Sequence, residues 1–282
     1  MKTIPALLIA LGLLTGSAAE AAYSCSVNSP GIVTAYDPQA AADRVPQSSA
    51  TVTCTRASGD PQQMPFTLSA DNGQNASGQG NKAILGTQLV AYDLFQNSTC
   101  KTRWRSPGGG FFEGPLDFAG SLSAAMPLDY WACIPSGQTG LTAGTYTDLV
   151  TMTLVYGPKK AEQVAPASTF SVSISTPWQC SISTTPGVLD FGAYLAFGPA
   201  LNASTTFGVT CTNSLGYTIA VSPASGVVTG LNYSVAPALT TNTGTGVQQI
   251  LTINGSMPGG QAGTCTGASC SGSNTHTVTI TY

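Results

Sequence analysis

Cysteine is the residue type whose number and spacing point most clearly to chemistry in this chain, and that chemistry is disulfide formation. The eight cysteines fall four and four into two halves that repeat one another. The repeat keeps one cysteine pair in each half at matching places, which narrows the connectivity that spacing alone leaves undetermined. The predicted disulfides are Cys25–Cys54, Cys180–Cys211, Cys100–Cys133 and Cys265–Cys270. Zinc binding is the alternative, but the spacings contain no CxxC pair and His276 is the single histidine.

Other combinations that could support catalysis are sparse. Five of the aspartates in the first half are candidates for catalytic carboxylates, but they are scattered and form no paired-carboxylate motif. They are Asp71, Asp93, Asp117, Asp129 and Asp148. The sequence contains no phosphate loop, dinucleotide fingerprint or metalloprotease motif. We therefore expect no enzyme, no cofactor and no metal. A glycosidase built from carboxylates alone stays open as an alternative, because pairs formed in space are invisible in sequence.

The first 21 residues have the features of a secretory signal. Lys2 provides the positive start, Ile4–Leu14 the short apolar core, and Ser17–Ala21 the small residues of a cleavage zone. We place cleavage near Ala21, with cleavage after Ala19 as an alternative. Since the apolar run is too short for a typical membrane span, the mature chain is predicted to be exported and soluble, a setting in which an even number of cysteines suits disulfides.

Charge is scarce, at 7% of residues. From Trp178 onward the single charged side chain is Asp190, and the whole chain has no basic patch of the kind that binds nucleic acid. Thr, Ser, Gly, Ala and Val dominate instead, as is typical of strands and turns. So little charge also suggests a surface that neighbouring molecules cover.

Short alternating runs, separated by Gly, Pro and Asn, predict β-strands throughout the mature chain. Each repeat closes with such a run ending in tyrosine, at Val150–Tyr156 and at His276–Tyr282. A helical turn is expected only over Gln39–Arg44. The clearest strand candidates are Ala50–Thr55, Leu149–Tyr156, Phe170–Ser175, Thr205–Thr210, Tyr217–Ser222, Gln248–Asn254 and Thr275–Tyr282. This pattern predicts an all-β protein of two tandem immunoglobulin-like β-sandwich domains.

The expected boundaries follow the repeat. Residues 1–21 form the signal peptide, 22–156 the N-terminal domain, 157–168 a linker and 176–282 the C-terminal domain. The first domain is the larger because it carries Gly-rich insertions around Asp71–Asn81 and Ser106–Gly120.

A spare alternating segment lies between the two domains and is the main indication of function. In residues 169–175, Phe170, Val172 and Ile174 share one face. We expect this segment to fold back and complete the first domain, whereas nothing follows the second domain to complete it. The second domain would then lack its last strand and accept one from outside. With no extension ahead of the first domain to donate, such a molecule would sit at the end of a polymer. The alternative is that both domains are complete and Phe170–Ile174 begins the second.

The second repeat resembles a known family. The motifs are a cysteine followed by an alternating strand, then Leu189–Tyr194 (LDFGAY), a strand ending in Val209–Thr212, and the terminal run Thr277–Tyr282. They are similar to the spore coat protein U domain, the pilin module of archaic, Csu-type chaperone–usher pili. The resemblance is good over about Trp178–Tyr282 and weaker over Tyr23–Tyr156.

The resemblance implies that the domains are of the pilin type and that the whole chain is a two-domain tip adhesin. Its implied partners are a periplasmic chaperone, an outer-membrane usher and the N-terminal donor strand of the next pilin subunit. Export would run through the periplasm to the cell surface, at the pilus tip. The groove for chaperone or subunit would be bordered by Val278, Ile280 and Tyr282.

The most unusual segment, between Trp104 and Phe118, is the candidate for contact with an abiotic or host surface, and through it for attachment and biofilm formation. Its apolar side chains would bind by burial if they lie on an exposed loop. The candidates are Trp104, Phe111, Phe112, Leu116 and Phe118. The alternative is that they anchor a long loop onto the core. Further loop candidates are Ala124–Leu128 and Gly137–Leu141.

Two other functions remain open on sequence alone. A secreted carbohydrate-binding module could stack sugars on Trp104, Tyr130 and Trp131. An extracellular coat protein could consist of self-sufficient sandwiches. Both would fold as stable monomers without a partner strand.

Overall fold

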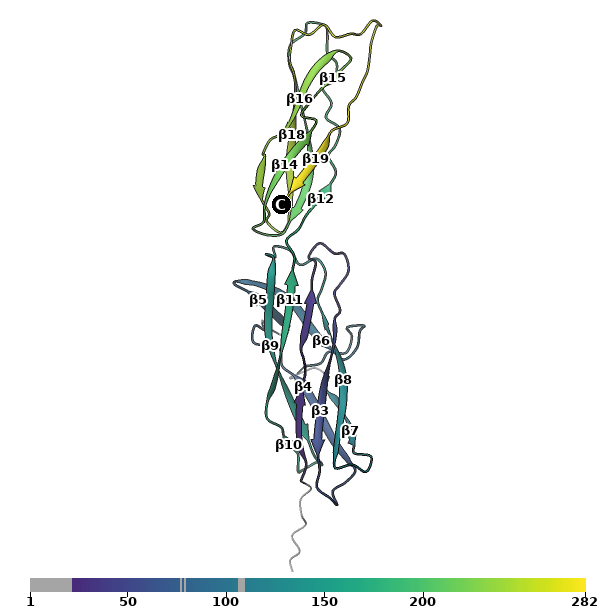
Figure 1. Ribbon diagram of the computed structural model, residues 1–282, viewed down its shortest axis with the longest axis vertical. Helices are drawn as coiled ribbons and strands as arrows, with labels where there is room; N and C mark the ends of the chain where they lie inside the picture. Colours follow the sequence, from purple (N-terminus) through teal and green to yellow (C-terminus); the bar gives the residue numbers. More distant parts are fainter. Residues whose placement is uncertain (1–21, 77, 79, 106–109) are drawn as a thin grey trace, which may run out of the picture.

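The computed structural model describes residues 22–282 except 77, 79 and 106–109. The predicted signal peptide, residues 1–21, lies outside the described residues. The all-β prediction is confirmed, because every regular element of the described chain is a strand. Within those ranges, no helix is long and apolar enough to cross a membrane. The two domains are stacked end to end along the long axis (Figure 1).

The first domain is built from strands that alternate buried and exposed residues, as the alternation in sequence predicts. Its strands are β1 (Ser24–Asn28), β2 (Ile32–Ala35), β3 (Gln47–Thr55), β4 (Gln63–Ala70), β5 (Asn81–Leu85), β6 (Gln88–Phe95), β7 (Phe112–Asp117), β8 (Ser123–Cys133), β9 (Gly144–Tyr156), β10 (Gln163–Val164) and β11 (Ser168–Thr176). They pair in the order β1-β3-β8-β6-β5-β9-β11-β2, with β4 joining β9 and β7, and β10 joining β9. The strands enclose one continuous apolar core.

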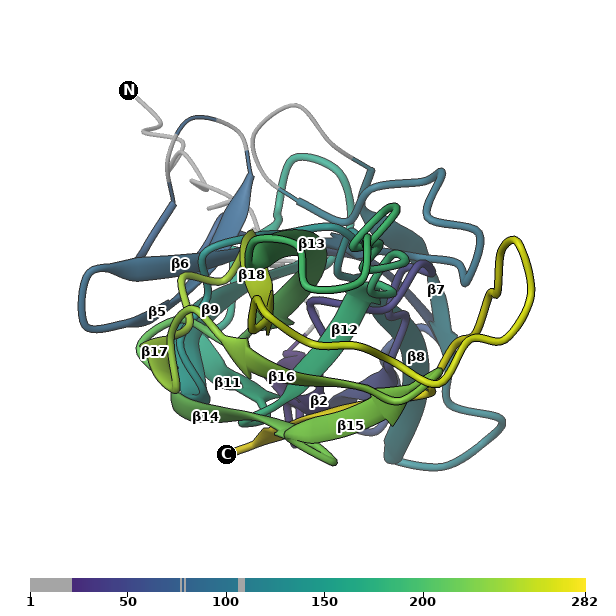
Figure 2. The ribbon, with the colours of Figure 1, turned by 90° about the horizontal axis from the view of Figure 1, so that it is seen from above.

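The second domain repeats this plan with fewer strands. They are β12 (Cys180–Thr184), β13 (Leu201–Cys211), β14 (Gly216–Ser222), β15 (Ser225–Val228), β16 (Leu231–Pro237), β17 (Thr241–Thr243), β18 (Gln248–Met257) and β19 (Thr277–Thr281). One sheet has the order β12-β13-β18-β16-β15 and the other β17-β14-β19. The connection from β18 to β19, at the yellow end of the colour scale, swings out sideways when the molecule is seen down its long axis (Figure 2).

The two repeats match strand by strand. The order β1-β3-β8-β6-β5 in the first domain recurs as β12-β13-β18-β16-β15 in the second. The register also recurs, since Leu68 of β4 faces Leu154 of β9, and Ile219 of β14 faces Ile280 of β19. Counting along these strands, Val150–Tyr156 corresponds to His276–Tyr282, an offset of 126 positions. This equivalence allows side chains to be compared position by position.

The segment predicted as a linker, residues 157–168, contacts the first domain, because Gln163–Val164 form β10 against β9 and the Ala165 N–H donates to the Leu154 carbonyl at 2.9 Å. One local prediction is wrong. The expected helical turn over Gln39–Arg44 does not form. A proline-initiated turn occupies its start, and Arg44 bridges to Ile134 instead.

The domains meet at a close backbone contact. The Asn213 N–H donates to the Leu141 carbonyl at 2.9 Å, and its side-chain amide donates to the Gly140 carbonyl at 3.1 Å. Gly246 has φ +72°, and a Cβ atom there would lie 2.4 Å from the Gly140 Cα. Only glycine suits that position, because both the backbone conformation and the space exclude a side chain.

Candidate functional site

In the first domain β11 fills the space between β9 and β2. It runs antiparallel to β9, with Ser168 opposite Met152 and Thr176 opposite Gly144, and parallel to β2 on its other side. Its apolar face is almost completely buried: Phe170 is 3% exposed, and Val172 and Ile174 are 0% exposed. The strand expected to complete this domain is therefore part of its core.

Phe170 anchors this strand among aromatic rings. Its ring centroid lies 6.1 Å from that of Trp104, in stacked orientation, and 5.3 Å from that of Tyr130. The backbone of β11 also passes close to Gly31, where a Cβ atom would lie 2.1 Å from the Ser171 carbonyl oxygen. Gly31 has φ +81°, so this turn requires glycine for both space and conformation.

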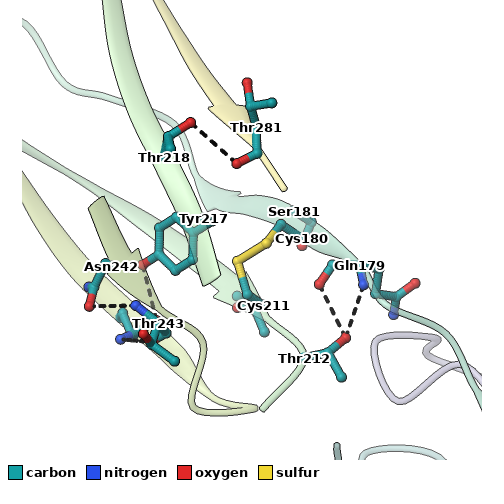
Figure 3. Close-up of a disulfide and its surroundings, with 12 residues drawn as sticks. Gln179, Cys180, Ser181, Cys211, Thr212, Tyr217, Thr218, Asn242, Thr243 and Thr281 are labelled. Carbon is teal, nitrogen blue, oxygen red and sulfur yellow. Dashed lines mark hydrogen bonds between the residues drawn. A yellow bond between two sulfur atoms is a disulfide. The ribbon is translucent and has the colours of Figure 1, made fainter. Parts of the chain in front are cut away.

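The matching face of the second domain has a different structure. Among the described residues, β19 pairs with β14 alone, so its second edge has no strand partner. The segment Gly187–Tyr194, which takes the place of β2, forms no strand. Figure 3 shows β19 beside β14, where the Thr218 hydroxyl donates to the Thr281 carbonyl at 3.4 Å. We call the face between β12, β19 and Gly187–Tyr194 the second-domain groove.

Side chains at equivalent positions of the two domains differ in how much of their surface is exposed to solvent. Val27 of β1 is 5% exposed, whereas its counterpart Ile182 of β12 is 40% exposed. Tyr156 at the end of β9 is 7% exposed, whereas Tyr282 is 59% exposed. In the first domain β11 and β10 cover these positions. The second domain thus carries the same apolar inner face without a strand over it.

The residues expected to border the groove, Val278, Ile280 and Tyr282, lie on or just beyond β19. Val278 and Ile280 are half-buried and pack against the core of the second domain. Three more apolar residues of this face were not predicted from the sequence: Ile182 of β12, which is exposed, and Leu189 and Phe191 of the loop, which pack against the core of the second domain. Ile182 could have been found by aligning the strand after Cys180 with the strand after Cys25.

A disulfide braces each sandwich beside its groove. Cys25–Cys54 and Cys180–Cys211 join directly opposite residues of paired strands, with Cα atoms 4.1 Å and 4.0 Å apart. Beside the second, the Thr212 hydroxyl lies between the N–H and the carbonyl of Gln179 (Figure 3). Cys100–Cys133 and Cys265–Cys270 are also bonded. These are the pairs that the repeat predicts, and they use the sulfur atoms of all eight cysteines, so that no thiolate is left to bind zinc.

The prediction that the surface-contact candidates are exposed is wrong for most of them, because they are buried. Trp104 is 0%, Leu116 1% and Phe118 2% exposed. They face inward because β7 pairs with β4 and the Trp104 indole N–H donates to the Leu68 carbonyl at 3.0 Å. Phe112 is half-buried with its ring 5.2 Å from that of Trp104, which leaves Phe111, at 44% exposure, as the exposed member. Residues 106–109 lie outside the described residues.

The same burial removes two of the three sugar-stacking candidates. Trp104 and Tyr130 are both 0% exposed, so neither ring can present a face to a ligand. Trp131 is half-buried. The carbohydrate-binding alternative therefore loses the aromatic platform on which it depended.

The polar groups considered for catalysis hold the structure together. The Asp71 carboxylate accepts the Thr151 N–H at 2.9 Å, and Asp93 forms an ion pair with Arg103 at 2.5 Å. Asp148 is 4% exposed and accepts the Tyr92 hydroxyl at 2.8 Å. Burial raises the pKa of the Asp148 carboxyl and, despite Arg103, that of Asp93. His276 lies just before β19 rather than within it.

Comparison with known families identifies the chain. The sequence model of the Spore Coat Protein U domain matches residues 11–153, and the chain belongs to this family. The match lies over the first repeat and not over Trp178–Tyr282, where the sequence motifs predicted the better resemblance.

Solved structures with some likeness come from several bacteria. The CsuC–CsuE chaperone–tip adhesion subunit complex of archaic chaperone-usher Csu pili of Acinetobacter baumannii is 13% identical, covers 92% of this chain and 99% of that one, and has a TM-score of 0.46. The CupB6 tip adhesin of Pseudomonas aeruginosa is 10% identical, with 83% and 88% covered and a TM-score of 0.37.

A third structure is the CssB subunit complemented with a donor strand from CssA of enterotoxigenic Escherichia coli. It is 18% identical, with 54% and 97% covered and a TM-score of 0.32. Since all three TM-scores are low, the family assignment rests on the sequence match. No curated protein matches the sequence.

Proposed function

We propose that this protein is a non-enzymatic pilus subunit whose second domain accepts a β-strand from another chain by donor-strand complementation. The observation that carries the proposal is the contrast between the two repeats. In the first, β11 fills the groove, and in the second the equivalent apolar residues, such as Ile182, are exposed. An apolar groove beside an unpaired strand edge is the arrangement that β-strand addition completes.

Strand β11 of the first domain indicates what kind of sequence would fit the second-domain groove. Within β11 three apolar side chains alternate with serines, so that one face enters the core while the other meets solvent. By the equivalence of β9 and β19, the residues Val150–Met152 that pair with Ser168–Phe170 of β11 correspond to His276–Val278. The incoming strand would run antiparallel to β19, with its apolar residues toward the face that Ile182 lines.

The use of β11 within its own chain supports a position at the tip of the pilus. Strand β11, which precedes the second domain, pairs with β9 and β2 of its own chain, so it is not available to complete a neighbouring subunit. The first domain, already completed, needs no partner strand. Only the second domain then joins the polymer. The partners implied are a periplasmic chaperone, an outer-membrane usher and the donor strand of the next subunit, with export through the periplasm to the cell surface.

The free first domain would make contact with an abiotic or host surface and so promote attachment and biofilm formation. Of the residues selected from sequence for this role, Phe111 retains the exposure that it requires, at 44%. Burial of such a side chain against an apolar surface contributes roughly 25 cal/mol per Å². Adhesion would therefore need several such residues acting together.

Binding of a synthetic peptide with the sequence of Ser168–Thr176 to the full mature chain tests the proposal. We expect saturable binding that is lost in Ile182→Asp, because Ile182 lines the second-domain groove. Ile250→Asp is the matched control, since Ile250 is 63% exposed on β18, between inward-facing neighbours. Binding that both variants retain, or no binding by the native chain, would overturn the proposal.

A further inference from the structure

His276 occupies a position in the second repeat that is fully buried and apolar in the first. The register places Val278 and Ile280 at the positions of Met152 and Leu154. Two residues earlier, His276 corresponds to Val150, which is 0% exposed in the core of the first domain. The only imidazole of the chain thus stands on the inner face of the groove.

The contacts of this histidine fix which of its nitrogens carries hydrogen. Its Nδ1 lies 2.6 Å from the Pro223 carbonyl oxygen, which can only accept, so Nδ1 is the donor. Its Nε2 lies 2.8 Å from the hydroxyl of Tyr233, and that hydroxyl also accepts the side-chain amide of Asn274 at 2.7 Å. The hydrogen bonds are complete when the Tyr233 hydroxyl donates to a neutral imidazole.

A second proton on the ring would disturb this arrangement. Nε2–H would then point at the Tyr233 hydroxyl, which would have to accept from both His276 and Asn274 and direct its own hydrogen elsewhere. None of the groups bonded to the ring carries a charge that could stabilise an imidazolium. The one charged side chain of residues 178–282 is Asp190, and its carboxylate accepts the Gly192 N–H at 2.8 Å.

Strand insertion would change the surroundings of this ring. In the first domain Phe170 of β11 lies opposite Val150, and the two side chains are 3% and 0% exposed. A strand entering the second-domain groove in the same register would place its corresponding residue beside His276. The imidazole, now half-buried, would lose its remaining contact with water, and such burial favours the uncharged form.

We propose that His276 makes acceptance of the partner strand dependent on pH, with tight insertion while the imidazole is neutral and weaker insertion once it is protonated. The inference rests on the proposed function, because it concerns the same groove. Inserting the strand onto a protonated ring requires the ring to lose its proton first, so affinity decreases as pH falls. Histidine side chains ordinarily change charge between about pH 5 and pH 8, which sets the window.

The test uses the full mature chain and the Ser168–Thr176 peptide with blocked ends, which contains no titratable side chain. We expect its dissociation constant to rise on the order of tenfold between about pH 7.5 and about pH 5.5. In His276→Val, which restores the residue type of the first repeat, we expect a change of less than about twofold. Because the chain has one histidine, the signals of its ring protons are readable by NMR, and they should change when the peptide binds.

Several results would overturn the inference. If the peptide affinity of His276→Val still depended on pH, a group other than His276 would be responsible. Equal affinity at both pH values in the native chain, or ring-proton signals that the peptide leaves unchanged, would show that insertion does not bury the imidazole. A native chain that binds the peptide at neither pH would overturn the proposed function as well, which distinguishes that failure from the others.

Discussion

The Tyr92 hydroxyl donates to Oδ2 of Asp148 across 2.8 Å inside the first domain. The second domain has a similar contact in which an asparagine takes the place of the aspartate: the side-chain amide of Asn274 donates to the Tyr233 hydroxyl at 2.7 Å. Both tyrosines lie on equivalent strands, β6 and β16, and both partners precede the matching positions Val150 and His276 by two residues. The contact between the tyrosine and its partner is therefore common to the two domains. It is buried in the first domain, which contains β11, and more exposed in the second.

The first prediction concerns this pair. Asp148 also accepts the N–H groups of Gln74 and Leu149, at 3.0 Å and 2.9 Å. Asp148→Ala would remove the carboxylate that accepts these N–H groups and the buried Tyr92 hydroxyl, and we expect it to lower the free energy of unfolding by roughly 2–4 kcal/mol. Asp148→Asn, which copies the second repeat, should keep most of that stability. Denaturant titration of both variants measures the difference, and equal losses would contradict the account.

The pH dependence of the same variants is a second prediction. Burial raises the pKa of the Asp148 carboxyl above 3.8, against smaller lowering effects of its hydrogen bonds from Tyr92 and backbone N–H groups. A raised pKa means that folding favours the protonated acid, so this contribution to stability is present below pH 3.8 and lost as pH rises through the folded-state pKa. The unfolding free energy of the native chain relative to Asp148→Asn should therefore decrease over that range. A difference that is constant or increases with pH would contradict the assignment.

Alternation and the internal repeat made most of the fold predictable from sequence. The strands around Val52, Val150 and Phe207 follow from period-two patterns, and the cysteine pairs follow from their repetition. The Trp104–Phe118 segment was predicted less well. Its glycines suggest an exposed loop, but Trp104 and Phe118 are buried by β4, β7 and the aromatic cluster around Phe170. Such long-range packing leaves no local pattern in the sequence.

A third prediction tests how much β11 contributes to the first domain. Ile174 is fully buried there, so Ile174→Ala should lower stability by about 2–5 kcal/mol. Ser171→Ala, on the exposed face of the same strand, should change it by less than about 0.5 kcal/mol. Thermal unfolding of both variants distinguishes a core strand from a peripheral one. Similar small effects would show that the domain does not depend on β11.

A fourth prediction concerns surface contact. Phe111→Ala should reduce attachment of the chain to apolar beads, because it removes an exposed ring, while the unfolding midpoint stays within about 2 °C. Leu239→Ala is a matched control, since Leu239 is an apolar residue of the second domain with 54% exposure. Equal attachment by the native chain and Phe111→Ala would remove Phe111 from the adhesive surface.

The central claim is that the second domain needs a strand from outside. The most direct measurement is the melting temperature of the mature chain with the sequence of Ser168–Thr176 joined after Tyr282 by a flexible linker. A control extension replaces Phe170, Val172 and Ile174 of that added copy with serine. The account predicts that the apolar extension raises the melting temperature of the second domain by at least about 5 °C over the native chain, and that the serine extension does not. Equal melting temperatures for all three forms would show that the second domain is complete without a donor strand, and would contradict the account.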